Sequence, residues 1–221
     1  MLGRLNLINI LYSLPAVFVA FSFHEYAHAL IAYGMGDPTP KNQGRLTLSP
    51  LAHVDWIGFI MFAIFGFGWA KPVQYNPTNF KNRKIGNILV SLAGPMANLV
   101  VAFLALIIIN IVGYNFSYAF YGNPNNTIVV VFTIFERIAS LNIVFAFLNL
   151  IPVPPFDGYK VVKAIFSRRN IKFFWTLERY SMIILFAMIF LNIFSYIIRF
   201  PYDFTYRYLN NIASWITGIF M

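Results

Sequence analysis

The chain has 221 residues, of which 59% are hydrophobic and only 10% are charged. A soluble domain of this length carries about a quarter charged residues, so the composition excludes an ordinary soluble fold and predicts an all-α polytopic membrane protein. The formal net charge is +9, and the chain contains no cysteine. Basic loops beside membrane spans set orientation and contact anionic lipid, so we expect the lipid bilayer, and no nucleic acid, as a partner. Disulfides and thiolate metal sites are excluded.

Four segments are apolar and long enough to cross the hydrocarbon as helices, which takes about 20 residues. Two shorter apolar segments are ambiguous, so the prediction is four to six transmembrane helices. We interpret residues 1–221 as a single domain with a core at 6–165 and accessory C-terminal helices at 166–221. The four clear spans are residues 6–33, 85–113, 127–151 and 177–199, and the two ambiguous segments are 56–70 and 208–221.

The loops between these spans differ in charge. Lys and Arg concentrate between the first and second spans and again between the third and fourth, whereas residues 114–126 contain neither. The positive-inside rule therefore predicts that the first two loops are cytoplasmic and that the N-terminus is outside. Within the first loop, GRLTL at 44–48 alternates after a glycine and predicts a short strand. This strand either shapes the loop or pairs with an unwound substrate.

The sequence HEYAH at 24–28 interrupts the first apolar span. Residues four apart lie on one face of a helix, so His24 and His28 could bind one metal ion, with Glu25 close by as a proton acceptor. This HExxH pattern is typical of zinc hydrolases, although it also occurs by chance. The alternative is a pair of histidines bonded to neighbouring helices beside a protonated glutamate. Ionisable residues inside a membrane are costly and therefore favour a functional site.

A catalytic zinc site needs a third protein ligand and a free position for water. Without cysteine, the candidates are His53 or a carboxylate outside the motif. Asp157 stands out because it follows the third span in NLIPVPPFDGYK, where three prolines interrupt the helix and Gly158 permits a turn. His53 is better explained as a loop histidine bonded to Asp55. The carboxylates outside the motif are Asp37, Asp55, Glu136, Asp157, Glu178 and Asp203.

Together these residues resemble the site-2 protease family of intramembrane zinc metalloproteases, in its compact form without PDZ or CBS domains. Ser49-Pro50 departs slightly from that family, in which many members have Asn-Pro. The matching segments are HEYAH at 24–28, GRLTLSPLAHVD at 44–55, GWAKPV at 68–73, SLAGPMAN at 91–98 and NLIPVPPFDG at 149–158.

The resemblance implies one Zn²⁺ per chain, bound by His24, His28 and Asp157. It further implies that Glu25 is the catalytic base and that Asn149 holds substrate or stabilises the oxyanion. The expected activity is hydrolysis of peptide bonds in or near transmembrane segments, with single-span membrane proteins as substrates. The expected location is a prokaryotic plasma membrane. A metal transporter using the same ligands is the alternative function, and an inactive scaffold is a third.

If Asp157 reaches the same zinc as His24 and His28, an even number of membrane crossings must separate them. The second and third spans supply two, so we predict that residues 56–70 dip into the membrane and return, or lie in its interface. The active site is then near the cytoplasmic side. In the second span we expect Asn98 either to pack between helices or to accept a hydrogen bond from a ligand histidine. Glu136 and Arg137, adjacent in the third span, are expected to find partners on other helices or to act near the outer interface.

Overall fold

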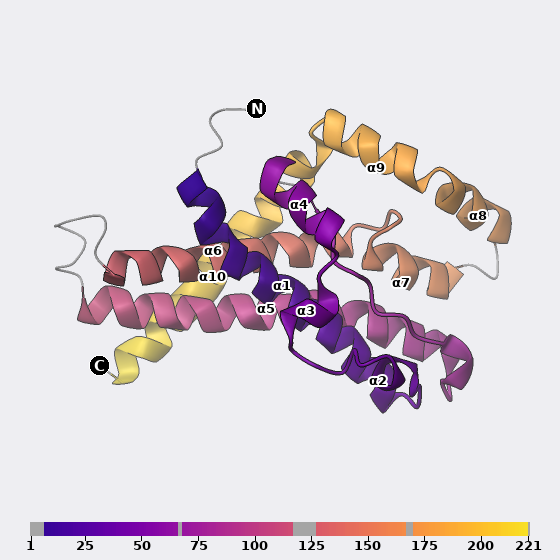
Figure 1. Ribbon diagram of the computed structural model, residues 1–221, viewed down its shortest axis with the longest axis horizontal. Helices are drawn as coiled ribbons and strands as arrows, with labels where there is room; N and C mark the ends of the chain where they lie inside the picture. Colours follow the sequence, from indigo (N-terminus) through magenta and orange to yellow (C-terminus); the bar gives the residue numbers. More distant parts are fainter. Residues whose placement is uncertain (1–6, 66–67, 117–126, 167–169, 221) are drawn as a thin grey trace.

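The computed structural model describes residues 7–65, 68–116, 127–166 and 170–220, and it is helical through most of these ranges (Figure 1). Three long helices form the centre: α1 (Leu7–Gly34), α5 (Arg83–Asn115) and α6 (Thr127–Leu150). Each is long and apolar enough to cross a membrane. The first three predicted spans are therefore confirmed as helices. Most of the uncharged loop, residues 117–126, and the basic Arg168 and Arg169 lie outside the described residues.

Small residues allow the three central helices to pack closely. Ala16 of α1, Ala105 of α5 and Ala139 of α6 share one buried cluster with larger aliphatic side chains such as Leu106. Small side chains at helix interfaces are typical of membrane bundles, where close van der Waals contact stabilises association. The start of α5 follows from local chemistry, since the side chain of Asn82 accepts a hydrogen bond from the backbone N–H of Ile85 and caps the helix.

The prediction of one span at residues 177–199 is wrong. The chain forms α8 (Ile171–Arg179) and α9 (Ser181–Phe190), which meet at a bend of 60°, followed by a separate helix, α10 (Ile193–Phe220). The second break falls at Asn192, whose φ of 54° lies in the left-handed region, where a helix cannot continue. Counting the bent pair as one span brings the candidate spans from three to four among the described residues, the lower end of the predicted range.

Residues 208–221 were predicted as a separate short segment, but 208–220 form the second half of α10. This helix lies across α6 and α5 (Figure 1). Tyr202 donates a hydrogen bond to Ser140 of α6 at 3.1 Å, and Asn110 of α5 donates to Asn210 at 3.0 Å. These contacts place α10 along the central bundle, although its composition alone does not predict a membrane span.

The segment between α1 and α5 contains α2 (Thr39–Asn42), α3 (Pro50–His53), α4 (Trp56–Phe65) and the 3₁₀ turn η1 (Pro77–Asn79). The strand predicted at 44–48 is wrong, since that segment has no strand partner. It folds instead onto α3: Arg45 donates to the carbonyl oxygen of Ala52, and the His53 ring bonds the carbonyl oxygen of Thr47 at 2.7 Å. Local side-chain to backbone bonds thus replace strand pairing.

Residues 56–70 form α4 and then return to its start, as the predicted reversal of this segment requires, whereas its depth in the membrane stays a prediction. Val54 and Ala70 form an isolated antiparallel bridge, so the two ends of this segment lie next to each other. Phe59 of α4 stacks on Phe18 of α1 with ring centroids 5.1 Å apart. Gly58 allows the returning segment to pass close to α4, because a Cβ at this position would lie 2.2 Å from the carbonyl oxygen of Trp69. Gly66, a further glycine of this apolar segment, lies outside the described residues.

Candidate metal centre and active site

Three side chains predicted to bind one metal converge. His24 and His28 project from α1, and Asp157 is the first residue of α7 (Asp157–Phe166). The Nε2 atoms of the two histidines are 3.0 Å apart, and each lies 3.0 Å from Oδ2 of Asp157. All three residues are buried. Asp157, which follows the two histidines by more than a hundred residues, therefore meets them at one point.

The tight turn before α7 brings Asp157 to this point. Gly158 packs against the end of α6 so closely that an added Cβ would lie 2.2 Å from the carbonyl oxygen of Leu150. Only glycine fits such a backbone approach. On the far side of the carboxylate, Lys160 donates to Oδ1 of Asp157 at 2.8 Å, one turn along α7. The aspartate is thus held from both sides with Oδ2 directed at the histidines.

The other nitrogen of each imidazole faces a group that can only accept a hydrogen bond. Nδ1 of His24 lies 2.6 Å from Oδ1 of Asn98, and Nδ1 of His28 lies 2.6 Å from the carbonyl oxygen of Val90. Both Nδ1 atoms therefore carry a proton, so each imidazole in its neutral form presents the lone pair of its Nε2 atom. Two such nitrogens and a carboxylate oxygen at mutual distances of 3.0 Å repel one another unless a cation lies among them.

The orientation of Asn98 is itself determined by its neighbours. Its Nδ2 donates to the carbonyl oxygen of Ala20 at 3.2 Å and to Oδ1 of Asn142 at 2.8 Å. Nδ2 of Asn142 in turn donates to the carbonyl oxygen of Ile138 at 2.8 Å. Because this chain of amides ends on backbone carbonyls, Oδ1 of Asn98 faces His24. The alternative in which Asn98 bonds a histidine is confirmed.

Gly94 makes room for the first imidazole. A Cβ at this position of α5 would lie 2.5 Å from Cε1 of His24 and 2.6 Å from its Nε2. No side chain fits there without displacing the ring. The glycine and Asn98, one turn apart on α5, together fix where His24 lies and which way it points.

This donor set fits Zn²⁺. Two neutral imidazole nitrogens and one carboxylate, with their Nδ1–H groups bonded to oxygen acceptors, are typical of three-ligand catalytic zinc sites. Within the described residues, His24, His28 and Asp157 form the one group of three such side chains whose donor atoms all lie within 4.8 Å of one another. The site could hold one ion per chain.

Glu25 lies beside this group and is also buried. Its Oε2 accepts a hydrogen bond of 2.7 Å from the backbone N–H of Val73, in the segment without regular secondary structure that follows Ala70. Its other oxygen bonds no described residue, so that oxygen is available to a water molecule or a substrate. The segment that returns from α4 thus positions the Glu25 carboxylate, which the HExxH pattern predicts to be the base.

Asp37 fastens this returning segment to the end of α1. Its carboxylate is fully buried and accepts bonds from the backbone N–H of Asn76 at 2.6 Å and from Nδ2 of Asn79 at 2.7 Å. Thr39 contributes its N–H and its hydroxyl. Burial alone would raise the pKa of the Asp37 carboxyl, but these hydrogen bonds outweigh burial and lower that pKa below its usual range.

Two other predicted residues lie elsewhere. The amide of Asn149, expected to contact substrate, donates to the carbonyl oxygen of Phe145 on its own helix at 3.0 Å and bonds none of the three converging side chains. His53 is not one of the converging side chains, but it ends the short helix α3 instead of lying in a loop, and its partner is Thr47 and not Asp55. The Asp55 carboxylate instead accepts from the backbone N–H groups of Ile57 and Gly58 at the start of α4.

Several groups at the site were not predicted. Lys160 was counted only as a loop charge, although its spacing of three residues from Asp157 could have indicated the contact on a helix. The backbone groups of Val73 and Val90 carry no sequence signal, because any residue type supplies them. Gly94 is one of several small residues in the second span, and only the position of His24 explains why glycine is required there.

Comparison with known proteins now adds to this geometry. Residues 12–192 match the model of Peptidase family M50. The chain belongs to Peptidase family M50. It is an integral membrane zinc metalloprotease, which confirms the site-2 protease resemblance and the predicted cofactor.

The relatives have the same description. The protein named "Putative zinc metalloprotease YwhC" from Bacillus subtilis is 39% identical over 155 residues, covering 69% of this chain and 68% of the relative. Rip2 of Mycolicibacterium smegmatis, named likewise, is 31% identical over 64% of this chain and 52% of its own length. Rip2 of Mycobacterium tuberculosis is 29% identical over 66% and 53%. The match thus spans about half the length of the mycobacterial relatives. No solved structure matches the chain.

Proposed function

We propose that this metalloprotease hydrolyses peptide bonds within or beside the transmembrane segments of single-span membrane proteins. The observation that carries the proposal is the convergence of His24, His28 and Asp157 on one point inside a membrane bundle, with Glu25 next to it. Three lone-pair donors buried this close together are costly without a cation. A peptide bond must enter the membrane-embedded part of the molecule to reach them.

In this proposal His24, His28 and Asp157 hold the metal. Zn²⁺ supplies Lewis acidity, which makes water nucleophilic near neutral pH. Glu25, fixed by the N–H of Val73, accepts the proton of the attacking water and returns it to the leaving amine. Asn98 and the Val90 carbonyl keep the imidazoles oriented throughout the reaction.

For Asn149 we retain the role of a substrate-side amide. It lies one turn beyond Phe145 on α6, close to where the chain turns towards Asp157. Its present bond to the Phe145 carbonyl would have to be exchanged for one to the substrate. This exchange is feasible because an amide bonded within its own helix gives up only one weak local interaction.

The remaining proposals concern location. The basic residues between the first and second spans, and those near α7, favour a cytoplasmic position for the site and an outer N-terminus. The named relatives are from bacteria, which supports a prokaryotic plasma membrane.

We treat residues 1–221 as one domain with its core at 6–165, since α10 packs on helices of the core and not apart from them.

The test is the variant Glu25→Gln, which keeps the shape of the side chain but cannot accept the proton. Expressed in native membranes, it should retain single-span substrates that co-purify with it, and wild-type protein should cleave these same proteins after reconstitution. We expect Glu25→Gln to bind zinc as wild type does and to show no cleavage. Cleavage by Glu25→Gln, or zinc transport into liposomes by a wild-type protein that cleaves no membrane protein, would contradict the proposal.

A further inference from the structure

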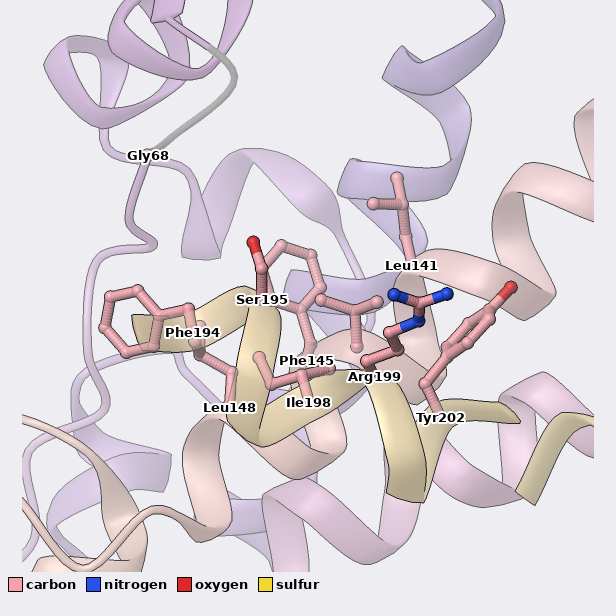
Figure 2. Close-up of a pocket in the computed structure, with 10 residues that line it drawn as sticks. Gly68, Leu141, Phe145, Leu148, Phe194, Ser195, Ile198, Arg199 and Tyr202 are labelled. Carbon is pink, nitrogen blue, oxygen red and sulfur yellow. The ribbon is translucent and has the colours of Figure 1, made fainter. Parts of the chain in front are cut away.

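A groove of about 410 Å³ lies between α6 and α10 (Figure 2). Leu141, Phe145 and Leu148 form its α6 wall, and Phe194, Ile198 and other residues of α10 form the opposite wall. Figure 2 shows Phe194 at one end of the groove and Arg199 with Tyr202 at the other. The lining is mostly apolar, and the Arg199 guanidinium is the one charged group that the described residues contribute to it.

The charged end of the groove lies near the middle of a membrane-crossing helix. Leu141 is about 21 Å along the axis from the start of α6 at the α-helical rise of about 1.5 Å per residue. The whole of α6, Thr127–Leu150, is about 36 Å long on the same basis. Tyr202, which follows Arg199 on α10, bonds Ser140 at this same level. With α6 spanning the bilayer, this level is well inside the hydrocarbon, and Arg199 lies there with it.

Arg199 has no ion pair with any carboxylate in the described part of the chain. Asp203 is one turn further along α10 but does not pair with it. A cation inside the hydrocarbon is costly unless it meets an opposite charge or water. Phosphates of lipid headgroups lie at the membrane surface, and dissolved anions do not enter hydrocarbon. The anion that can reach this depth is a carboxylate carried by another membrane helix.

The groove is also next to the catalytic site. Phe145, in its wall, packs against Phe21 with ring centroids 5.1 Å apart. Phe21 precedes Glu25 by one turn on α1. Gly68 lines the groove and belongs to the same returning segment as Val73, whose backbone N–H donates to Glu25. The wall of the groove is thus in contact, through this pair of aromatic rings, with the helix that carries the proposed base.

We propose that the groove between α6 and α10 binds the transmembrane helix of a substrate that carries an Asp or Glu near the bilayer centre, with Arg199 pairing with that carboxylate. Arg199 is thus a specificity-determining residue. The inference rests on the proposed intramembrane proteolysis and adds the feature of the substrate that is recognised. Apolar walls accept any membrane helix, whereas the guanidinium favours those with a carboxylate at the matching depth.

The absence of cysteine provides a direct assay. In a Ser195→Cys variant, the groove carries the protein's one thiol. The probe is a designed single-span helix of Leu and Ala with one Asp at its midpoint and a cysteine one turn away, reconstituted with the protein in vesicles. A matched probe carries Asn in place of Asp. We expect the Asp helix to cross-link about tenfold more than the Asn helix, the size expected for one buried polar contact between membrane helices.

Charge reversal isolates the role of Arg199. Arg199→Gln in the Ser195→Cys background should remove the preference for Asp over Asn, and Arg199→Asp should transfer the preference to a probe carrying Arg. Arg207→Gln is the matched control, because Arg207 is exposed on α10 two turns away and does not line the groove. It should leave the preference intact. Asp203→Asn should also retain it, since Asp203 is not the partner of Arg199.

Equal cross-linking of the Asp and Asn probes, or a preference that persists in Arg199→Gln, would overturn the inference. Loss of the preference in Asp203→Asn would also count against it. A cysteine bridge between two copies of Ser195→Cys without any probe would show that the groove is covered by a second copy instead. Because zinc content and cleavage are measured separately, failure of the proposed protease activity with an intact Asp preference can be told apart from failure of the inference.

Discussion

Two faces of the same helix, α6, differ in how their polar groups are satisfied. The face towards α1 and α5 carries Asn142, which is fully buried, and both ends of its amide are bonded, to Asn98 and to the Ile138 carbonyl. The face towards α10 carries Leu141, Val144 and Phe145 and borders a groove whose one cation has no ion pair among the described residues. We call the first face, with its fully bonded amide, the closed face, and the second face, with its cation unpaired in the described part of the chain, the open face.

The difference shows what each face can do. A ligand histidine needs a fixed tautomer and a fixed orientation, and a chain of amides ending on backbone carbonyls provides both. A surface that takes up and releases a membrane helix needs the opposite, apolar walls and a polar group that is not already paired. Substitutions on the closed face should therefore reduce metal binding, whereas those on the open face should change only which helices bind.

The largest effect is expected from Gly94→Ala, on α5, the helix that the closed face of α6 packs against. The new Cβ would lie 2.5 Å from Cε1 of His24, so the imidazole must leave its position. Zinc affinity should fall about a hundredfold or more, the upper end for changes that act through a ligand's neighbours. The measurement is a zinc competition titration. Gly113→Ala, on the same helix with its nearest neighbour 3.9 Å from the new Cβ, is the control and should bind zinc normally.

A smaller effect is expected from Asn98→Leu, which removes the acceptor for Nδ1–H of His24 and leaves Asn142 without its donor. Zinc affinity should fall about tenfold to a hundredfold, and the loss should appear in the same titration. Asn110→Leu breaks the other asparagine pair of α5, the one with Asn210, and should leave zinc affinity unchanged. Equal losses in both variants would mean that the effect is one of folding and that the closed face has no special role.

The smallest effect is expected from Asp37→Asn, which acts on the loop that positions Val73 and not on either face of α6. Loss of a buried, charge-assisted hydrogen-bond set should lower stability by about 2 kcal/mol. Because the folded-state pKa is lowered, the Asp37 contribution is complete above the ordinary aspartate pKa of about 3.9 and disappears as the pH falls through the lower folded value.

Thermal unfolding in detergent at several pH values measures this contribution. The wild type should melt above Asp37→Asn at neutral pH, and the gap should close in strong acid. A gap that widened on acidification would show that the carboxylate is not held in its charged form.

The core of this fold could be predicted from sequence because its signals are local. The first three spans are long apolar runs, and His24 and His28 meet through helical spacing alone. Asp157 could be predicted because prolines and Gly158 mark a turn at the end of a span, where a carboxylate has few structural explanations. The return of residues 56–70 followed from requiring Asp157 and the histidines to share one side.

The remainder depends on tertiary contacts that leave little pattern. The apolar run at 177–199 continues through Asn192, so its periodicity conceals the break there. The alternation in GRLTL is typical of a strand, but the bonds of Arg45 and His53 to nearby carbonyls determine its conformation. Arg199, Asp203 and Arg207 disqualify α10 as a span by composition, and only its contacts with α6 and α5 show where it lies.

The most direct test of the central claim is the zinc content of purified Asp157→Ala, measured by elemental analysis beside wild type, Glu25→Gln and Asp203→Ala. If His24, His28 and Asp157 share one ion, wild type and the last two variants should each carry about one zinc per chain. Asp157→Ala should carry far less under the same chelator wash. Full zinc occupancy in Asp157→Ala would contradict the account.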